Sequence, residues 1–153
     1  MTLNCMKSTW DVLISNHQNI VTMADVDSSA IIGSNVTMQE STVIEGDAHI
    51  GDNCVLDKRV VIEKHAIIGS GVKMGEHCVI ERKVNIGNDC NFGKHVVVEG
   101  GAVVGIGVKI GDDVVLEKDT KVPDGADIPM GTVLSAGKTY PDGTTLKAKY
   151  YKK

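Results

Sequence analysis

The chain has 153 residues, which is enough for a single domain with its own hydrophobic core. Its formal net charge of −4 argues against a nucleic-acid-binding protein, and no apolar run approaches the roughly 20 residues of a membrane-spanning helix. Aromatic residues make up only 3% of the chain, so the core has to be built from aliphatic side chains.

The first 19 residues show no periodic pattern. Ser8 or Thr9 could cap a short helix near Trp10, and we predict that residues 1–19 form an N-terminal cap over the rest of the domain. The segment lacks the layout of a signal peptide, and we therefore expect a soluble, cytoplasmic protein with no membrane partner.

A six-residue pattern fills residues 20–135. Every sixth residue from Ile32 to Leu134 is apolar, and four residues after each comes a second column that holds only small or β-branched residues. A period of six fits neither a helix nor a two-sided strand, but it suits a chain that turns a corner every six residues. The pattern already begins at four earlier residues: Ile20, Ala24, Val26 and Ala30. We predict an all-β solenoid of about six three-sided coils.

Five of these hexads carry a glycine directly after the aliphatic residue: IIGSNV, HIGDNC, IIGSGV, NIGNDC and KIGDDV. This unit resembles the hexapeptide-repeat, left-handed parallel β-helix family, many members of which are acyltransferases. The left hand is implied by the resemblance alone, because ordinary parallel crossovers are right-handed. The resemblance covers about two thirds of the chain and implies a single domain.

No loop interrupts the hexads, although many enzymes of the family that the chain resembles use an inserted loop to shape the active site. The pattern ends after Leu134, and the sequence Tyr140-Pro141-Asp142-Gly143 has the composition of a tight turn. We predict that residues 136–153 form a C-terminal hairpin and a basic tail, which is either solvated or contacts a ligand phosphate.

Valine occupies one outward position in six successive coils, 18 residues apart: Val43, Val61, Val79, Val97, Val115 and Val133. The equivalent positions on the other two sides are mixed. A continuous apolar stripe on the outside of a rod marks an interaction surface. Because rods of this kind in the family usually form parallel homotrimers, we expect a homotrimer that closes through the valine side.

Charged residues flank the valines. Glutamates follow on one edge (Glu45, Glu63, Glu81, Glu99 and Glu117), and basic residues lie on the other (Lys58, Arg59, His77, Lys94 and His95). Carboxylates stacked at ~4.8 Å repel one another unless something neutralises them. Three interpretations stay open: local pairs with neighbouring Lys or Arg, ion pairs with the basic edge of the next subunit, and a bound cation.

His77 and His95 lie one coil apart beside this predicted interface. Acyltransferases that resemble this family place a catalytic histidine and the thioester of acyl-CoA in clefts between subunits. By that resemblance, the two histidines are candidates for the general base, with acetyl-CoA or another acyl-CoA as donor. His95 is the preferred base and His77 the second candidate, because Asn91 and Asn85 lie near His95 on outward positions. Glu81 or Glu99, or a partner's glutamate, could orient the ring. We expect Asn85 and Asn91 to bind the small-molecule acceptor.

Two other histidine roles compete with catalysis. Both rings could simply form intersubunit ion pairs. Alternatively, trimeric enzymes that resemble γ-class carbonic anhydrases hold zinc with three histidines, two of them close in sequence. The five histidines here are at least twelve residues apart: His17, His49, His65, His77 and His95. We therefore predict no metal site, and we expect Cys54, Cys78 and Cys90 to be buried thiols of the small inward column.

Two classes of function remain. The first is an acyl-CoA-dependent transferase that acylates a small hydroxyl or amine acceptor. The second is a non-catalytic trimer, a binding or structural rod that offers its corners to a small ligand or its sides to a protein. The regularity of the hexads supports the second class, because stacked coils make a stiff scaffold without any chemistry.

Overall fold

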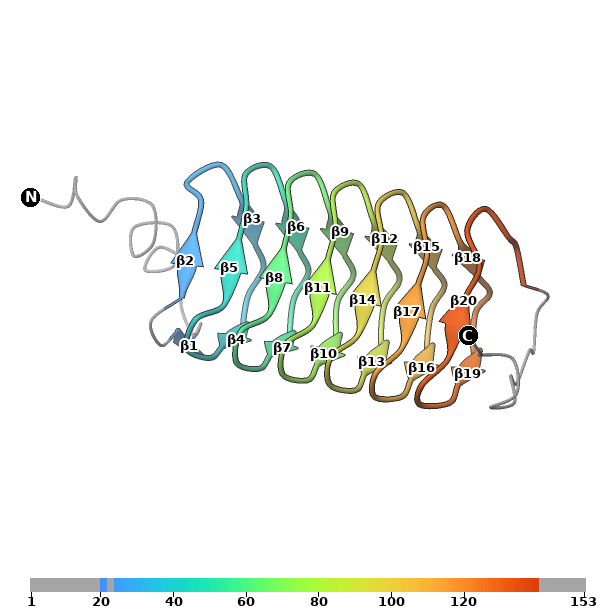
Figure 1. The fold of residues 1–153 in the computed structure, drawn as a ribbon. Coiled ribbons are helices and arrows are strands. Elements are labelled where there is room, and N and C mark those ends of the chain that lie inside the picture. Colours follow the sequence, from blue (N-terminus) through green and yellow to red (C-terminus); the bar gives the residue numbers. More distant parts are fainter. Residues whose placement is uncertain (1–19, 22–23, 141–153) are drawn as a thin grey trace, which may run out of the picture.

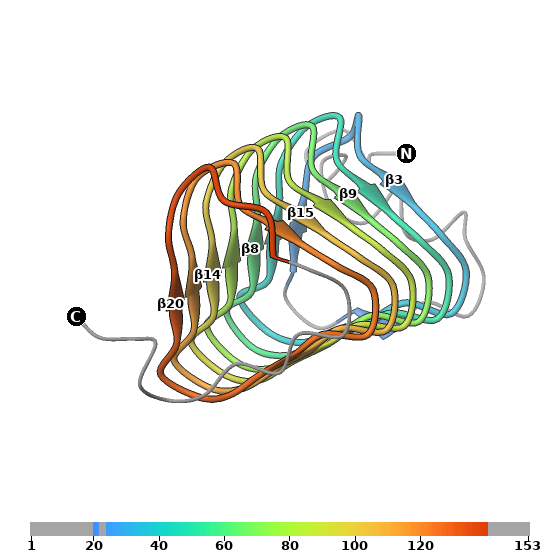
Figure 2. The same cartoon turned by 90° about the vertical axis from the view of Figure 1, so that its right-hand side faces the viewer.

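A computed structural model describes residues 20–21 and 24–140 of the protein. These residues form a three-sided parallel β-helix of two-residue strands joined by short corners (Figure 1). The view along the axis shows the triangular cross-section (Figure 2). The predicted all-β solenoid of three-sided coils is confirmed. No helix of the length and apolarity that a membrane span requires occurs in the described ranges.

The strands form three parallel sheets, one on each side of the prism. Sheet A contains β1 (Ile20–Val21), β4 (Thr37–Met38), β7 (Val55–Leu56), β10 (Lys73–Met74), β13 (Asn91–Phe92), β16 (Lys109–Ile110) and β19 (Asp127–Ile128). Sheet B contains β2 (Asp25–Val26), β5 (Val43–Ile44), β8 (Val61–Ile62), β11 (Val79–Ile80), β14 (Val97–Val98), β17 (Val115–Leu116) and β20 (Val133–Leu134). Sheet C contains β3 (Ile31–Ile32), β6 (His49–Ile50), β9 (Ile67–Ile68), β12 (Asn85–Ile86), β15 (Val103–Val104) and β18 (Lys121–Val122).

From β2 to β20, each strand turns its first residue outward and its second residue into the core. Strand partners are 18 residues apart, as in the pairs Val79 with Val97 and Ile80 with Val98. Both predicted inward columns are buried throughout, from Ile32 to Leu134 and from Val36 to Thr132. The hydrophobic columns therefore fix the register, because a slip of one residue would turn every core side chain toward the solvent.

Every sixth residue from Asn35 to Gly137 has a positive φ and forms the tip of a corner. Glycine accepts this left-handed conformation freely, whereas other L-residues lose roughly 1–2 kcal/mol there, and Asn and Asp less than most. Twelve of these tips are nevertheless not glycine, and they include Arg59 and the three histidines His65, His77 and His95. Several tip side chains contact the tip one coil away, as Asn35 Nδ2 does with Asn53 Oδ1 at 3.2 Å.

The two ends of the solenoid differ from the sequence-based prediction. Ile20 was predicted to face inward, but it pairs with the outward Thr37, because one residue fewer separates β1 from β2 than separates the later strands. At the other end, the register continues past Leu134: Thr139 bridges Lys121 in parallel, and Tyr140 packs against the core. The predicted N-terminal cap and the turn of the C-terminal hairpin lie outside the described residues.

Candidate functional site

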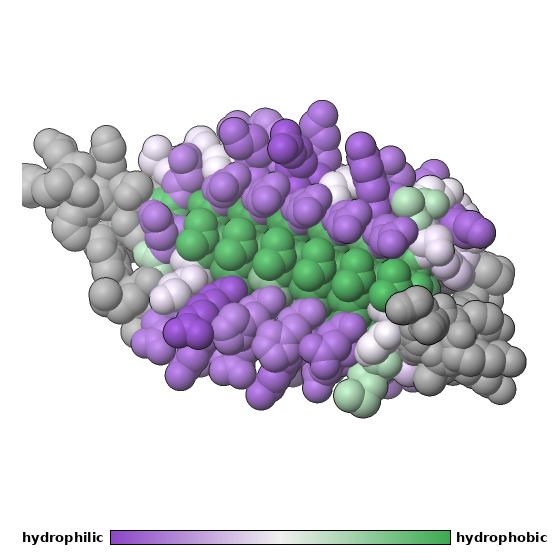
Figure 3. Space-filling model, in the orientation of Figure 1, coloured by the Kyte–Doolittle hydropathy of each residue, from purple (hydrophilic) through white to green (hydrophobic). Residues whose placement is uncertain are grey.

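The outer face of sheet B carries the six valines as one continuous apolar band, which we call the valine stripe (Val43, Val61, Val79, Val97, Val115 and Val133). Figure 3 shows it as a green band between two polar rows. Each valine is half-buried between these rows, whereas the outward Ile67 and Val103 on sheet C are 49% and 39% exposed. The trimer interface that was predicted here stays a prediction.

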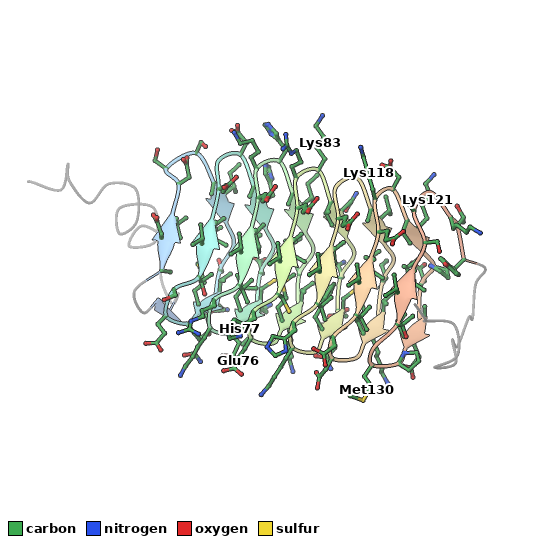
Figure 4. All side chains as sticks on the ribbon, in the orientation of Figure 1. Glu76, His77, Lys83, Lys118, Lys121 and Met130 are labelled. Carbon is green, nitrogen blue, oxygen red and sulfur yellow. The ribbon has the colours of Figure 1, made fainter. Side chains whose placement is uncertain are left out.

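One polar row follows the corner between sheets A and B, which we call the A–B corner. Four successive tips contact one another in a chain there: Arg59, His77, His95 and Asp113. Arg59 Nη1 lies 3.2 Å from His77 Nε2, the ring centroids of the two histidines are 5.1 Å apart, and His95 Nδ1 lies 3.3 Å from Asp113 Oδ1. Figure 4 shows His77 at this edge of the β-helix. We call these four residues the imidazole stack.

The neighbours of each ring define which nitrogen is available. Asp113 Oδ1 lies at ion-pair distance from Nδ1 of His95, so the carboxylate favours a proton on Nδ1 and the lone pair of the neutral ring on Nε2. The guanidinium of Arg59 can only donate, so Nε2 of His77 is its acceptor and is already engaged. Nδ1 of His77 is buried without a hydrogen-bond partner among the described residues. His95, whose side chain is 55% exposed, is therefore the histidine with a free basic nitrogen.

The second polar row follows the corner between sheets B and C, which we call the B–C corner. Each of its five glutamates accepts a hydrogen bond from a main-chain N–H 19 residues ahead; for example, Glu81 Oε2 lies 2.9 Å from Gly100 N and Glu99 Oε2 lies 3.0 Å from Lys118 N. No ion pair in the described part of the chain involves these glutamates. Their charge is thus stabilised by peptide groups of the next coil, rather than by the local lysines and arginines of the first interpretation.

The orienting role predicted for Glu81 and Glu99 is therefore not filled within one chain, because both lie across the valine stripe from the imidazole stack. The carboxylate that lies beside the His95 ring is that of Asp113, and the sequence reasoning missed this residue. The signal was available: a further step of 18 residues along the column of His77 and His95 arrives at Asp113.

The two asparagines predicted to bind an acceptor lie on different sides of the prism. Asn91 is the exposed first residue of β13 in sheet A, in the same hexad as the corner that carries His95. Asn85 begins β12 in sheet C, which is the side opposite the A–B corner. One chain therefore brings Asn91, but not Asn85, to the side of His95.

The buried cysteines offer no nucleophile. Cys54, Cys78 and Cys90 are free and buried, and burial raises the pKa of Cys78 to about 11. Each thiol donates to a carbonyl of the next coil, such as Gly93 O at 3.1 Å from Cys78 Sγ. No group of three or more His, Cys, Asp or Glu side chains in the described ranges is placed to hold a metal ion.

The comparison with protein-family models identifies the domain. The model of the GMPPB C-terminal domain matches residues 26–126. The chain belongs to this family. No curated protein sequence matches the chain. The match to the GMPPB C-terminal domain spans the stacked coils from β2 to the last residues before β19 and includes the whole imidazole stack.

Solved structures share the fold of this GMPPB C-terminal domain. A candidate acetyltransferase of Bacillus cereus is 17% identical with a TM-score of 0.62, and the alignment covers 86% of this chain and 80% of that chain. The UDP-N-acetylglucosamine acyltransferase of Francisella novicida is 20% identical with a TM-score of 0.66, and the alignment covers 81% of this chain and 59% of that chain. Together with the family match, these structures confirm the hexapeptide-repeat, left-handed parallel β-helix; at this level of identity they show the fold alone.

Proposed function

We propose that the protein is an acyl-CoA-dependent transferase that acylates a small hydroxyl or amine acceptor, in a homotrimer whose subunits meet at the valine stripe. The observation that carries this proposal is the pair of His95 and Asp113. A carboxylate beside Nδ1 and a side chain that is 55% exposed suit a general base that acts through Nε2, and the pair lies at the edge of an apolar surface.

The reaction needs one proton carrier. Nε2 of His95 would take the proton of the acceptor hydroxyl or amine while the acceptor oxygen or nitrogen attacks the thioester carbon. Asp113 would stabilise the imidazolium that forms. Collapse of the tetrahedral intermediate breaks the bond between carbon and sulfur, and the proton passes from the imidazolium to the leaving thiolate of CoA. Atoms and charges balance without a metal ion.

The remaining residues of the imidazole stack would position His95. His77 lies against the His95 ring, with the two ring planes inclined at 35°, and Arg59 fixes His77 from the other side. Asn91 is the acceptor-binding candidate from the same chain. Asn85, Glu81 and Glu99 could reach the site only from an adjacent subunit. The proposal also includes acetyl-CoA or another acyl-CoA as the donor, a small hydroxyl or amine compound as the acceptor, and a cytoplasmic location.

The test is release of free CoA from acetyl-CoA in the presence of a panel of amino and hydroxyl acceptors. We expect His95→Asn to lower the rate about 100-fold or more, because general bases contribute roughly 10² to 10⁴. Asn is the appropriate replacement, because Asn35 and Asn53 hold the same corner conformation, with φ of 58° and 60°. His65→Asn is the matched control: His65 is also a corner tip (φ 63°), with Asp47 Oδ2 at 3.9 Å from its Nδ1.

Asp113→Asn separates a positioning role from a structural one. We expect a fall in rate of about tenfold or more with an altered pH profile, while the KM for acetyl-CoA changes little. Full turnover by His95→Asn, or equal losses in His95→Asn and His65→Asn, would refute the assignment of His95.

The uninterrupted hexads favour a second candidate, a non-catalytic trimeric rod that binds a small ligand or a protein. From residue 24 to residue 140 no corner carries an inserted loop, so one chain supplies little wall for a substrate pocket. A stable trimer that neither binds acetyl-CoA nor releases CoA with any acceptor would favour this candidate.

A further inference from the structure

A hollow interrupts the B–C corner between β14 and β15. The corner carries Gly100-Gly101, whereas the coils on either side carry Arg82-Lys83 and Lys118-Asp119 at the same two positions. The missing side chains leave an open notch of about 420 Å³, which we call the glycine notch. Figure 4 shows Lys83 and Lys118 projecting from this edge, one from each neighbouring coil.

The three cations around the glycine notch form no close ion pairs, although carboxylates also line it. Arg82, Lys83 and Lys118 are exposed, and none forms an ion pair with a described residue. The fold does pair lysines elsewhere: at the A–B corner, Lys94 Nζ lies 3.2 Å from Glu76 Oε1. Three cations without an ion pair therefore surround this one hollow.

Three carboxylates also line the notch, and two of them are already engaged. Glu81 and Glu99 accept the main-chain N–H groups of Gly100 and Lys118. The carboxylate of Asp119 packs over Gly101, in the space that a Cβ at that position would fill. The lining as a whole is neutral, and its uncommitted groups are cationic.

The main chain at this corner has no N–H to offer a ligand. The amide of Gly100 donates to Glu81, that of Gly101 to Arg82 O at 3.3 Å and that of Asp119 to Gly100 O at 3.1 Å. The notch is thus unlike a glycine-rich phosphate loop, which holds its ligand through main-chain amides. An anion here would be held by side chains, and a guanidinium with two ammonium groups matches phosphate oxygens.

We propose that the glycine notch binds a phosphate group of a small phosphate-bearing ligand through Arg82, Lys83 and Lys118. The absence of side chains at Gly100 and Gly101 leaves the room that a phosphate needs between two successive coils. The inference does not depend on acyl transfer, because phosphate binding here uses only the two glycines and the three cations of the notch.

The test is calorimetric titration of inorganic diphosphate into the full-length protein at low ionic strength, where surface charges are little screened. We expect saturable binding at one site per chain. Arg82→Gln with Lys118→Gln should weaken it about 100-fold, because each of the two lost charged contacts corresponds to roughly tenfold in Kd. The matched control, Lys73→Gln with Lys109→Gln, removes the same charge from the outer face of sheet A and should change Kd by less than about twofold.

Gly100→Gln tests the space rather than the charge. A Cβ at Gly100 would meet its nearest neighbour, Arg82 O, at 3.4 Å, which is ordinary contact, so this variant should fold with an unchanged circular dichroism spectrum. The added side chain fills the notch while all three cations remain, and we expect diphosphate binding to be lost. Wild-type binding by Gly100→Gln, equal weakening in the control double variant, or no saturable binding at millimolar diphosphate would overturn the proposal.

A second titration identifies the source of the phosphate. If CoA binds and loses affinity in the notch variants while pantetheine does not respond to them, the phosphate belongs to a nucleotide-bearing donor. If only diphosphate responds, the ligand is a free phosphate compound. His95→Asn should bind diphosphate like the wild type, so failure of the notch and failure of the proposed transferase are distinguishable.

Discussion

The two edges of the valine stripe use charge in different ways. At the A–B corner, side chains pair with one another across successive coils, as Lys94 does with Glu76 at 3.2 Å and His95 with Asp113 at 3.3 Å. At the B–C corner, the glutamates bond to main-chain amides, and the neighbouring lysines and arginines form no ion pair with them. His65 and Asp47 do pair at the B–C corner, at 3.9 Å, but its lysines and arginines form no ion pair with a described residue, whereas Lys58 and Lys94 of the A–B corner do.

The difference arises from position and length of the side chains. A corner tip such as Asp113 lies directly beside the tip one coil away, so its short side chain meets the ring of His95. A glutamate two residues after a valine is not at a tip, and its longer side chain reaches the amide 19 residues ahead. The first arrangement places a carboxylate beside an imidazole, and the second leaves the lysines and arginines of the B–C corner without an ion pair.

The largest expected effect is the dissociation of the predicted trimer, which separates the A–B corner of one subunit from the B–C corner of the next. In a closed trimer, one edge of each stripe faces the opposite edge of the next subunit, because rings are built from heterologous contacts. Val97→Asp places an unpaired carboxylate in the middle of that contact, where its desolvation is costly. We expect the mass measured by light scattering at micromolar concentration to fall threefold, from trimer to monomer.

The matched control for this variant is Val55→Asp, which lies on the outer face of sheet A, where Val55 is 38% exposed. It introduces the same side chain outside the stripe, and we expect the trimer to persist. A wild-type protein that is a monodisperse monomer, or a trimer that survives Val97→Asp, would contradict the predicted interface.

A smaller effect, on the free energy of unfolding, distinguishes a glutamate that accepts a main-chain hydrogen bond from a glutamate in a surface ion pair. Glu81→Ala removes the acceptor of the Gly100 amide and should destabilise the protein by about 1 kcal/mol, whereas Glu81→Gln keeps an acceptor oxygen and should cost less. Glu76→Ala removes only an exposed ion pair and should leave the urea midpoint unchanged. All midpoints need one protein concentration, because an oligomer is stabilised by mass action. Equal shifts for Glu81→Ala and Glu76→Ala would contradict the distinction.

The fold could be predicted from the sequence because core residues recur at fixed positions in every six-residue unit. An aliphatic residue every sixth position and a small residue four places later allow one solution, and both columns are buried as expected from Ile32 to Leu134. The prediction fails at Ile20, because the segment between β1 and β2 is one residue shorter than the segments between later strands. Periodicity in the later coils does not reveal that this segment is shorter.

The candidate site was less predictable, because an 18-residue period shows which residues are stacked but not which atoms touch. The column of His77 and His95 was visible in the sequence, yet the glutamates two residues beyond each valine seemed suitable partners until the corner geometry directed them to main-chain amides. Asn85 illustrates a second limit, which is that closeness in sequence does not imply closeness in space. Asn85 lies only six residues before Asn91, but the two residues belong to different sides of the prism.

The smallest predicted effect concerns one pair of the A–B corner. A hydrogen bond from Lys94, reinforced by its positive charge, lowers the pKa of Glu76 below its ordinary value of 4.5, and the same contact raises the pKa of Lys94. A lowered pKa in the folded state means that this contribution to stability is present above pH 4.5 and is lost as the pH falls through the folded pKa. Because both side chains are exposed, the change in stability is small and the pKa itself is the better observable.

Lys94→Gln should return the pKa of Glu76 toward its ordinary value, as followed by ¹³C NMR titration of its carboxyl carbon. Lys118→Gln is the control from the other edge: it removes an equivalent positive charge that has no contact with Glu76, and the titration of Glu76 should not move. If both variants shift Glu76 equally, the lowered pKa reflects the general field of the protein. A shift confined to Lys94→Gln would show that charges at the A–B corner interact mainly with the side chain one coil away, which is the same spacing as the pair of His95 and Asp113.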